Sequence, residues 1–125
     1  IQEAMVAKEL SIQSLMPLIW EGLPLTEESD LEWKVRFNLY TYAFTESKLR
    51  QAQREKLDQF RALMESLIRQ LQASGEIRTD TDAKLITRMA FDMASGAAQN
   101  LLMLPLEERV ENVQELFPML EQLRP

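Results

Sequence analysis

Apolar residues recur at three- and four-residue steps along most of this chain, which is the pattern of amphipathic helices. The steps delimit five expected helices, at about residues 2–21, 30–44, 46–73, 81–104 and 107–123, and Pro118 is a candidate for splitting a last short turn off the fifth. No segment alternates apolar and polar residues with a period of two, so we expect no sheet. The pattern therefore predicts an all-α, multi-helix bundle of about five helices, folded as a single domain over residues 1–125.

The clearest break in this pattern is the segment Gly75-Glu-Ile-Arg-Thr-Asp-Thr-Asp82. Gly75 suits the position just after a helix, where the backbone is left-handed at little cost to glycine. Asp80 or Thr81 is expected to cap the next helix, because a short side-chain oxygen accepts hydrogen bonds from free N–H groups. The sequence Ser29-Asp-Leu-Glu32 matches a capping box and predicts the start of the helix near residue 30.

The helix expected over residues 81–104 is apolar around most of its circumference. Its polar side is narrow and consists of Lys84, Arg88, Asp92, Ser95 and Gln99. A surface helix usually has an apolar stripe little more than ~100° wide, and the arc here is roughly twice that. We favour a dimer seam over complete burial inside a monomer. Two edges are candidates, one with Phe91, Ala98 and Leu102 and the other with Leu85, Met89 and Gly96.

Composition and charge restrict the possible functions. The chain contains no cysteine and no histidine, so it lacks a thiolate, the commonest general base and the commonest transition-metal ligand. We therefore expect no enzyme, no metal site and no cofactor. A formal net charge of −6 without a dense basic stripe disfavours direct binding of duplex DNA. No apolar run approaches the ~20 residues of a membrane span, so we expect a cytoplasmic protein without a membrane partner.

Aromatic residues are concentrated in the first half of the chain, and methionines occur on the longer helices. One interpretation is a ligand pocket, in which aromatic rings would suit a cationic molecule and methionines an adaptable wall. The other interpretation is ordinary core packing, which is the commoner outcome for any single residue. The candidate pocket residues are Trp20, Trp33, Phe37, Tyr40, Phe44, Phe60, Met64, Met89 and Met93.

Several segments also follow one another in an informative order. They are Leu23-Pro-Leu-Thr-Glu-Glu, Glu46-Ser-Lys-Leu-Arg, Gly75-Glu-Ile-Arg-Thr-Asp-Thr-Asp-Ala, Ser95-Gly96-Ala97 and Leu104-Pro105. Over about residues 10 to 123, this set resembles the C-terminal domain of TetR-family transcriptional regulators, particularly the BetI-like branch. The chain departs from that pattern at Ser95-Gly96-Ala97, where the family often has Asp-Gly-Leu.

The resemblance implies a ligand-sensing and homodimerisation domain of a bacterial repressor, in which an unknown small-molecule effector releases operator DNA. The last two long helices would form a four-helix dimer interface, which adds Val113, Phe117 and Leu120 to the candidate seam. Operator DNA would be bound only through an N-terminal helix-turn-helix domain absent from this chain, which fits Ile1 as its first residue. The alternative is a helical protein–protein interaction adaptor without a small-molecule pocket.

Overall fold

Helices predominate because the sequence is rich in good helix formers and contains only 3 Gly and 5 Pro. The computed structural model describes residues 22–116 and 118–125. They form, in order, α3 (Glu27–Ala43), α4 (Ser47–Ala73), α5 (Ala83–Leu102), α6 (Leu106–Gln114) and α7 (Pro118–Glu121). These ranges contain no β-strand, so the predicted all-α class is confirmed. The helix expected over residues 2–21 lies outside the described residues.

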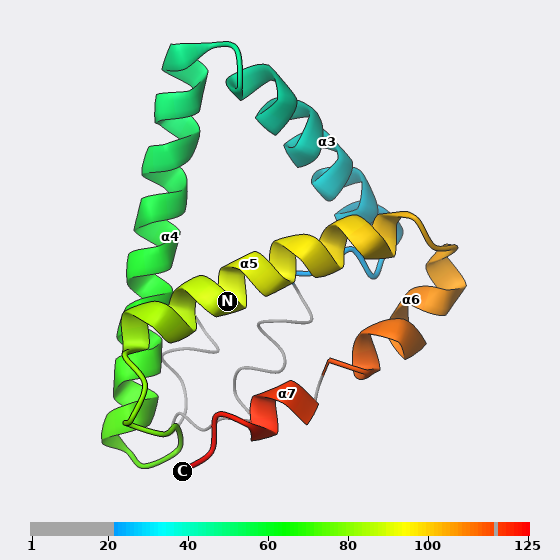
Figure 1. The fold of residues 1–125 in the computed structure, drawn as a ribbon. Coiled ribbons are helices and arrows are strands. Elements are labelled where there is room, and N and C mark those ends of the chain that lie inside the picture. The colour runs from blue at the N-terminus through cyan, green and yellow to red at the C-terminus, as the bar shows by residue number, and fades with distance from the viewer. Residues whose placement is uncertain (1–21, 117) are drawn as a thin grey trace.

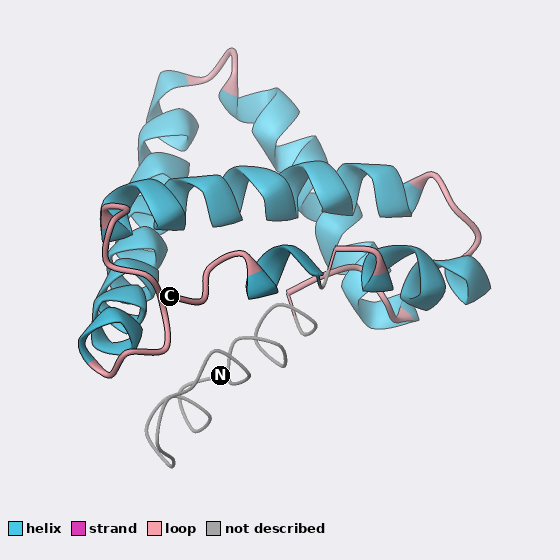
Figure 2. Cartoon of the chain, turned by 60° about the horizontal axis from the view of Figure 1, so that its bottom comes forward, coloured by secondary structure: helices cyan, strands magenta, loops and turns pink. Residues whose placement is uncertain are grey.

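The three long helices form the sides of a triangle (Figure 1). A short turn joins α3 to α4, and α5 runs from the far end of α4 back to the beginning of α3. The chain then returns through α6 and α7 along α5, as the turned view in Figure 2 also shows. The backbone N–H of Arg78, in the connector between α4 and α5, donates to the carbonyl of Leu123 over 2.7 Å. The end of the chain is therefore fixed to the corner between α4 and α5.

Buried apolar side chains of the described part form two clusters, one at each end of α5. The first joins the end of α4, the connector and the start of α5 through Leu67, Ile68, Leu71, Ile77, Ala83 and Ile86. The second joins the end of α5 to α6 and to the segment before α3 through Leu23, Leu25, Leu101 and Val113. Helix α5 is therefore anchored at both ends, and its middle bridges the two clusters.

Gly75 ends α4 as the sequence predicts. Its φ is +83°, a left-handed conformation that L side chains rarely adopt. The N–H of Glu76 donates to the carbonyl of Leu71 (2.9 Å) and that of Gly75 to the carbonyl of Gln72 (3.2 Å). These two bonds are the Schellman pattern, which satisfies carbonyls that the helix end leaves free.

Replacing Gly75 with alanine is expected to lower the free energy of unfolding by roughly 1–2 kcal/mol, which is the cost of a left-handed backbone with a Cβ. Nothing lies within 4 Å of a Cβ at this position, so the backbone conformation alone sets the cost. Urea unfolding followed by circular dichroism measures it. Gly75→Asn is the graded control, since asparagine tolerates this conformation better; equal stability of the alanine variant and the parent chain would contradict the assignment.

Two predicted helix starts are displaced. The cap of α3 is Thr26, not Ser29: the hydroxyl of Thr26 accepts from the N–H of Ser29 (3.1 Å), and Ser29 Oγ accepts from the N–H of Thr26 (3.0 Å). The capping box thus begins one turn earlier than predicted. Asp30 lies in the first turn of α3. The cap of α5 is Asp82 rather than Asp80 or Thr81, because the Asp80 carboxylate is bound to Arg78 instead.

The helix expected over residues 107–123 is not continuous. Helix α6 has 9 residues and ends at Gln114, and α7 is a single turn of 4 residues that begins at Pro118. Pro118 has no N–H to donate to the carbonyl of Gln114, and its ring clashes with that carbonyl in a regular helix. The expectation of two long helices at the end of the chain is therefore wrong for the second one.

Candidate functional site

An aromatic ladder on one face of α3 is formed by Trp33, Phe37 and Tyr40, which are spaced by one helical turn each. The Trp33 and Phe37 ring centroids are 5.5 Å apart, and those of Phe37 and Tyr40 are 6.3 Å apart with an edge-to-face tilt. Trp33 is buried, and its Nε1–H donates to the carbonyl of Gly22 over 2.8 Å. Phe37 and Tyr40 are half-buried. The ladder therefore combines a fixed base with two accessible rings.

A second aromatic pair connects α4 to the middle of α5. The rings of Phe60 and Phe91 meet edge to face with centroids 5.2 Å apart. The Arg61 guanidinium lies 5.6 Å from the centre of the Phe91 ring. This pair holds α5 against α4 between the two buried clusters, and it accounts for the partial burial of Phe91.

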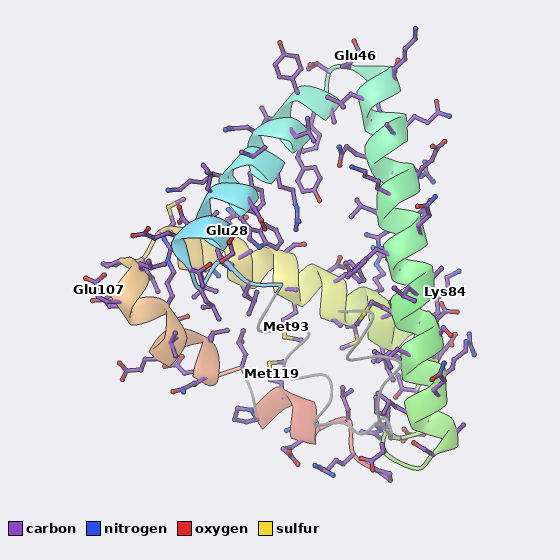
Figure 3. The ribbon with its side chains drawn as sticks, turned by 180° about the vertical axis from the view of Figure 1, so that it is seen from behind. Glu28, Glu46, Lys84, Met93, Glu107 and Met119 are labelled. Atoms are coloured by element: carbon purple, nitrogen blue, oxygen red, sulfur yellow. The ribbon has the colours of Figure 1, made fainter. Side chains whose placement is uncertain are left out.

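The remaining candidate pocket residues are dispersed. Phe44 is largely exposed at the C-terminal cap of α3, and Met89 is more than half exposed on α5. Met64 packs against the buried cluster at the α4–α5 corner. Met93 is half-buried and projects from α5 on the side where α7 lies (Figure 3). Trp20 lies outside the described residues. Among the described pocket candidates, ring contacts link Trp33, Phe37 and Tyr40 to one another.

An open groove of the described residues lies elsewhere, between α4 and α5. It encloses about 690 Å³ and is lined chiefly by charged side chains, including Asp58, Arg61, Glu65, Lys84 and Arg88. Lys84 marks its place at the start of α5, beside α4 (Figure 3). No residue of the candidate pocket lines it. The sequence pattern did not indicate this groove, because its residues read as the ordinary solvated faces of two helices.

The two candidate edges of α5 differ in how far their own subunit covers them. Phe91 and Leu102 are half-buried, and Ala98 is 0% exposed. On the other edge, Leu85, Met89 and Met103 are 50%, 56% and 80% exposed. Gly96 lies on the same line of the helix, and a Cβ added there would meet nothing within 4 Å. We call Leu85, Met89, Gly96 and Met103 the exposed α5 line.

This difference corrects part of the sequence-based interface. Ala98 and Val113 have no exposed surface to offer to a partner, and Val113 belongs to the second buried cluster. Phe117 and the side chain of Leu120 lie outside the described part of the chain. The sequence also missed Met103, although it falls seven residues after Gly96 and therefore on the same side of the helix.

A buried cation on α6 is a structural feature that the sequence did not indicate. Arg109 is only 5% exposed. Its Nη1 donates to the Asp30 carboxylate over 2.7 Å and to the carbonyl of Pro24 over 3.0 Å, and its Nε donates to the carbonyl of Leu104 over 3.1 Å. Lys34 binds the same carboxylate over 2.8 Å. The two cations lower the pKa of Asp30 from its ordinary value of 3.8, Lys34 first and Arg109 second.

The lowered pKa of Asp30 makes stability depend on pH in a defined direction. A carboxyl group with a lowered folded-state pKa contributes stability that is present above its unfolded pKa and is lost as the pH falls through the folded value. The free energy of unfolding should therefore fall as the pH drops below about 4, and Asp30→Asn should flatten this fall. Urea unfolding at a series of pH values measures it.

Asp80 provides a matched control for that titration. Its pKa is also lowered, by a hydrogen bond from Arg78. Both partners are largely exposed, so solvent screens their interaction. Asp80→Asn should leave the acid profile close to that of the parent chain. A profile unchanged by Asp30→Asn would contradict the role given to the Arg109 cluster.

Comparison with known proteins adds one finding. The family model for the C-terminal domain of BetI-type transcriptional repressors matches residues 12–117 of the chain. No curated protein and no solved structure matches significantly. None of the helices in the described ranges has the length and apolarity needed to cross a membrane. The family match covers most of the sequence and agrees with the all-helical fold, so the chain belongs to the C-terminal domains of BetI-type repressors in the TetR family of transcriptional regulators.

Proposed function

We propose that this chain is the effector-sensing and homodimerisation domain of a bacterial transcriptional repressor, and that effector binding releases the operator DNA. In this proposal the DNA is bound by a helix-turn-helix domain outside the chain. The observation that carries the proposal is the exposed α5 line, whose three large apolar residues are each half or more exposed. The other apolar sides of α5 are packed against α4, α6 and the segment before α3.

A second copy of the chain is the occupant that best fits this line. Most soluble homo-oligomers are symmetric dimers in which the same patch meets itself. Apolar side chains contribute roughly 25 cal/mol for each Å² removed from water. Gly96 allows the partner backbone to approach closely, and the polar strip beside the line carries charges of both signs, such as Arg88 and Asp92 at 3.5 Å. Such a patch is complementary to its own copy.

The aromatic ladder is the place where we propose that an effector binds. Phe37 and Tyr40 offer accessible ring surface beside the fixed Trp33. The Arg36 guanidinium already lies 4.3 Å from the Trp33 ring centre, which is the position that a quaternary amine would take. We therefore favour an uncharged or anionic aromatic effector over a cationic one.

One observation favours the adaptor function instead. Leu31, Val35 and Tyr42 form an exposed apolar row on α3. By their helical spacing they lie opposite the ladder, so α3 is apolar on two sides. A partner helix could pack against this outer row. The two functions therefore predict binding on opposite faces of one helix.

A titration with the anionic aromatic dye 1-anilinonaphthalene-8-sulfonate separates them. If the ladder binds effectors, the dye binds saturably, and Phe37→Leu weakens binding at least about tenfold, or about 1.4 kcal/mol. Val35→Ser, on the outer row of α3, is the matched control and should change the affinity little. Loss of dye binding with Val35→Ser but not with Phe37→Leu would favour the adaptor.

A further inference from the structure

Arg109 joins two parts of the molecule that are far apart in the sequence. Its guanidinium reaches Asp30 and the carbonyl of Pro24 across 79 and 85 residues of chain. Asp30 lies in the first turn of α3 and Pro24 in the segment just before that helix, whereas Arg109 lies on α6. A buried and hydrogen-bonded ion pair is costly to open, because each charge would lose its partner without full access to water.

On α3, the residue that pairs with Arg109 lies next to the aromatic ladder. Asp30 is one turn before Trp33 on the same helix. The segment before α3 is held at two points, because Trp33 Nε1–H binds the carbonyl of Gly22 and Arg109 binds the carbonyl of Pro24. A shift of the ladder along or around the helix axis therefore cannot leave the Arg109 contacts unchanged.

Arg109 lies on α6, which packs against α5, the helix that carries the exposed α5 line. Val113 of α6 is fully buried in one cluster with Leu101 of α5. The Arg109 Nε also holds the carbonyl of Leu104, in the turn between α5 and α6. The guanidinium thus contacts the start of α3 and the end of the α5–α6 turn simultaneously.

We propose that Arg109 is a positioning residue that couples occupation of the aromatic ladder to the association of two subunits through the exposed α5 line. The inference rests on the proposed function and adds the physical connection between its two sites. A ligand that binds one arrangement of α3 better than another shifts the equilibrium toward that arrangement. Through the Arg109–Asp30 pair, this shift changes the geometry of α6, and by reciprocity subunit association changes affinity at the ladder.

The test measures the Kd of the dimer by sedimentation equilibrium with and without saturating 1-anilinonaphthalene-8-sulfonate. In the parent chain the dye should change this Kd by about fivefold or more, which is the lower range of allosteric coupling. In Asp30→Asn and in Arg109→Lys the dye should still bind, but its effect on the dimer should disappear. A purely structural ion pair would lower stability in both variants and leave the ratio of the two Kd values unchanged.

Lys34→Met is the matched control, because Lys34 binds the same carboxylate but belongs to α3 and is more than half exposed. It should keep the effect of the dye. If Arg109→Lys fails to fold, Asp30→Asn decides. Persistence of the dye effect in Asp30→Asn would overturn the role of Arg109 and leave the proposed function standing. A parent chain that does not dimerise would refute the proposed function, whereas a dimer whose Kd ignores bound dye would refute the coupling alone.

Discussion

Replacing Arg109 with methionine is expected to lower the free energy of unfolding by about 3–5 kcal/mol, because removing one partner of a buried ion pair has a cost in this range. Methionine keeps much of the side-chain volume but makes no hydrogen bond. The Asp30 carboxylate then retains only Lys34, and the carbonyls of Pro24 and Leu104 lose their donor. Urea unfolding at fixed protein concentration, followed by circular dichroism, measures the loss.

Arg69→Met is the control for this prediction. Arg69 pairs with Glu65 over 3.1 Å on the surface of α4, and its side chain is more than half exposed. Exposed ion pairs contribute about 0–1 kcal/mol, so this variant should stay close to the parent chain. Equal losses of unfolding free energy in Arg69→Met and Arg109→Met would show that the burial of Arg109 does not determine how much it stabilises the fold.

Replacing Gly96 with leucine is expected to dissociate the dimer without harming the subunit. A Cβ at this position meets nothing within 4 Å in the subunit, and leucine is the better helix former by roughly 0.8–1 kcal/mol. Forcing extra volume into a packed contact typically costs about 1–3 kcal/mol. The Kd of the dimer should therefore rise by roughly 5- to 150-fold, while the secondary structure of the subunit stays intact.

Ser95→Leu provides the control for the dimer prediction. Ser95 precedes Gly96 on α5, is exposed, and belongs to the polar strip. Sedimentation equilibrium should give a Kd within about twofold of the parent chain, a difference below roughly 0.5 kcal/mol. A Kd that is unchanged in both variants, or raised equally in both, would argue against close contact at Gly96.

Local sequence patterns predicted most of the helical framework. The apolar stripe over residues 46–73 corresponds to α4, and Gly75 ends it because this position requires a left-handed backbone. The start of α3 was misplaced because Ser29-x-x-Glu32 matches the usual capping-box pattern, whereas the earlier box Thr26-x-x-Ser29 has serine where the pattern has Glu or Gln. The structure selects the earlier one, in which Asp30 lies in the first turn of the helix and meets Arg109.

The candidate sites were less predictable because they depend on contacts between distant segments. The periodicity of α5 indicates two possible edges, and the burial of Ala98 and the contact of Phe91 with Phe60 on α4 show that one of them is covered. No local sequence pattern indicates that Arg109 is buried and paired, since its partners Asp30 and Pro24 precede it by 79 and 85 residues. Trp33, Phe37 and Tyr40 share a face because their spacing is set within one helix.

The mass of the unmodified chain in solution tests the central claim most directly. The exposed α5 line is apolar surface that one subunit leaves uncovered, so we expect two copies to share it. Sedimentation equilibrium over a series of micromolar concentrations should give a species of twice the 14.5 kDa chain mass. A mass that stays at 14.5 kDa up to the highest concentration would contradict the account.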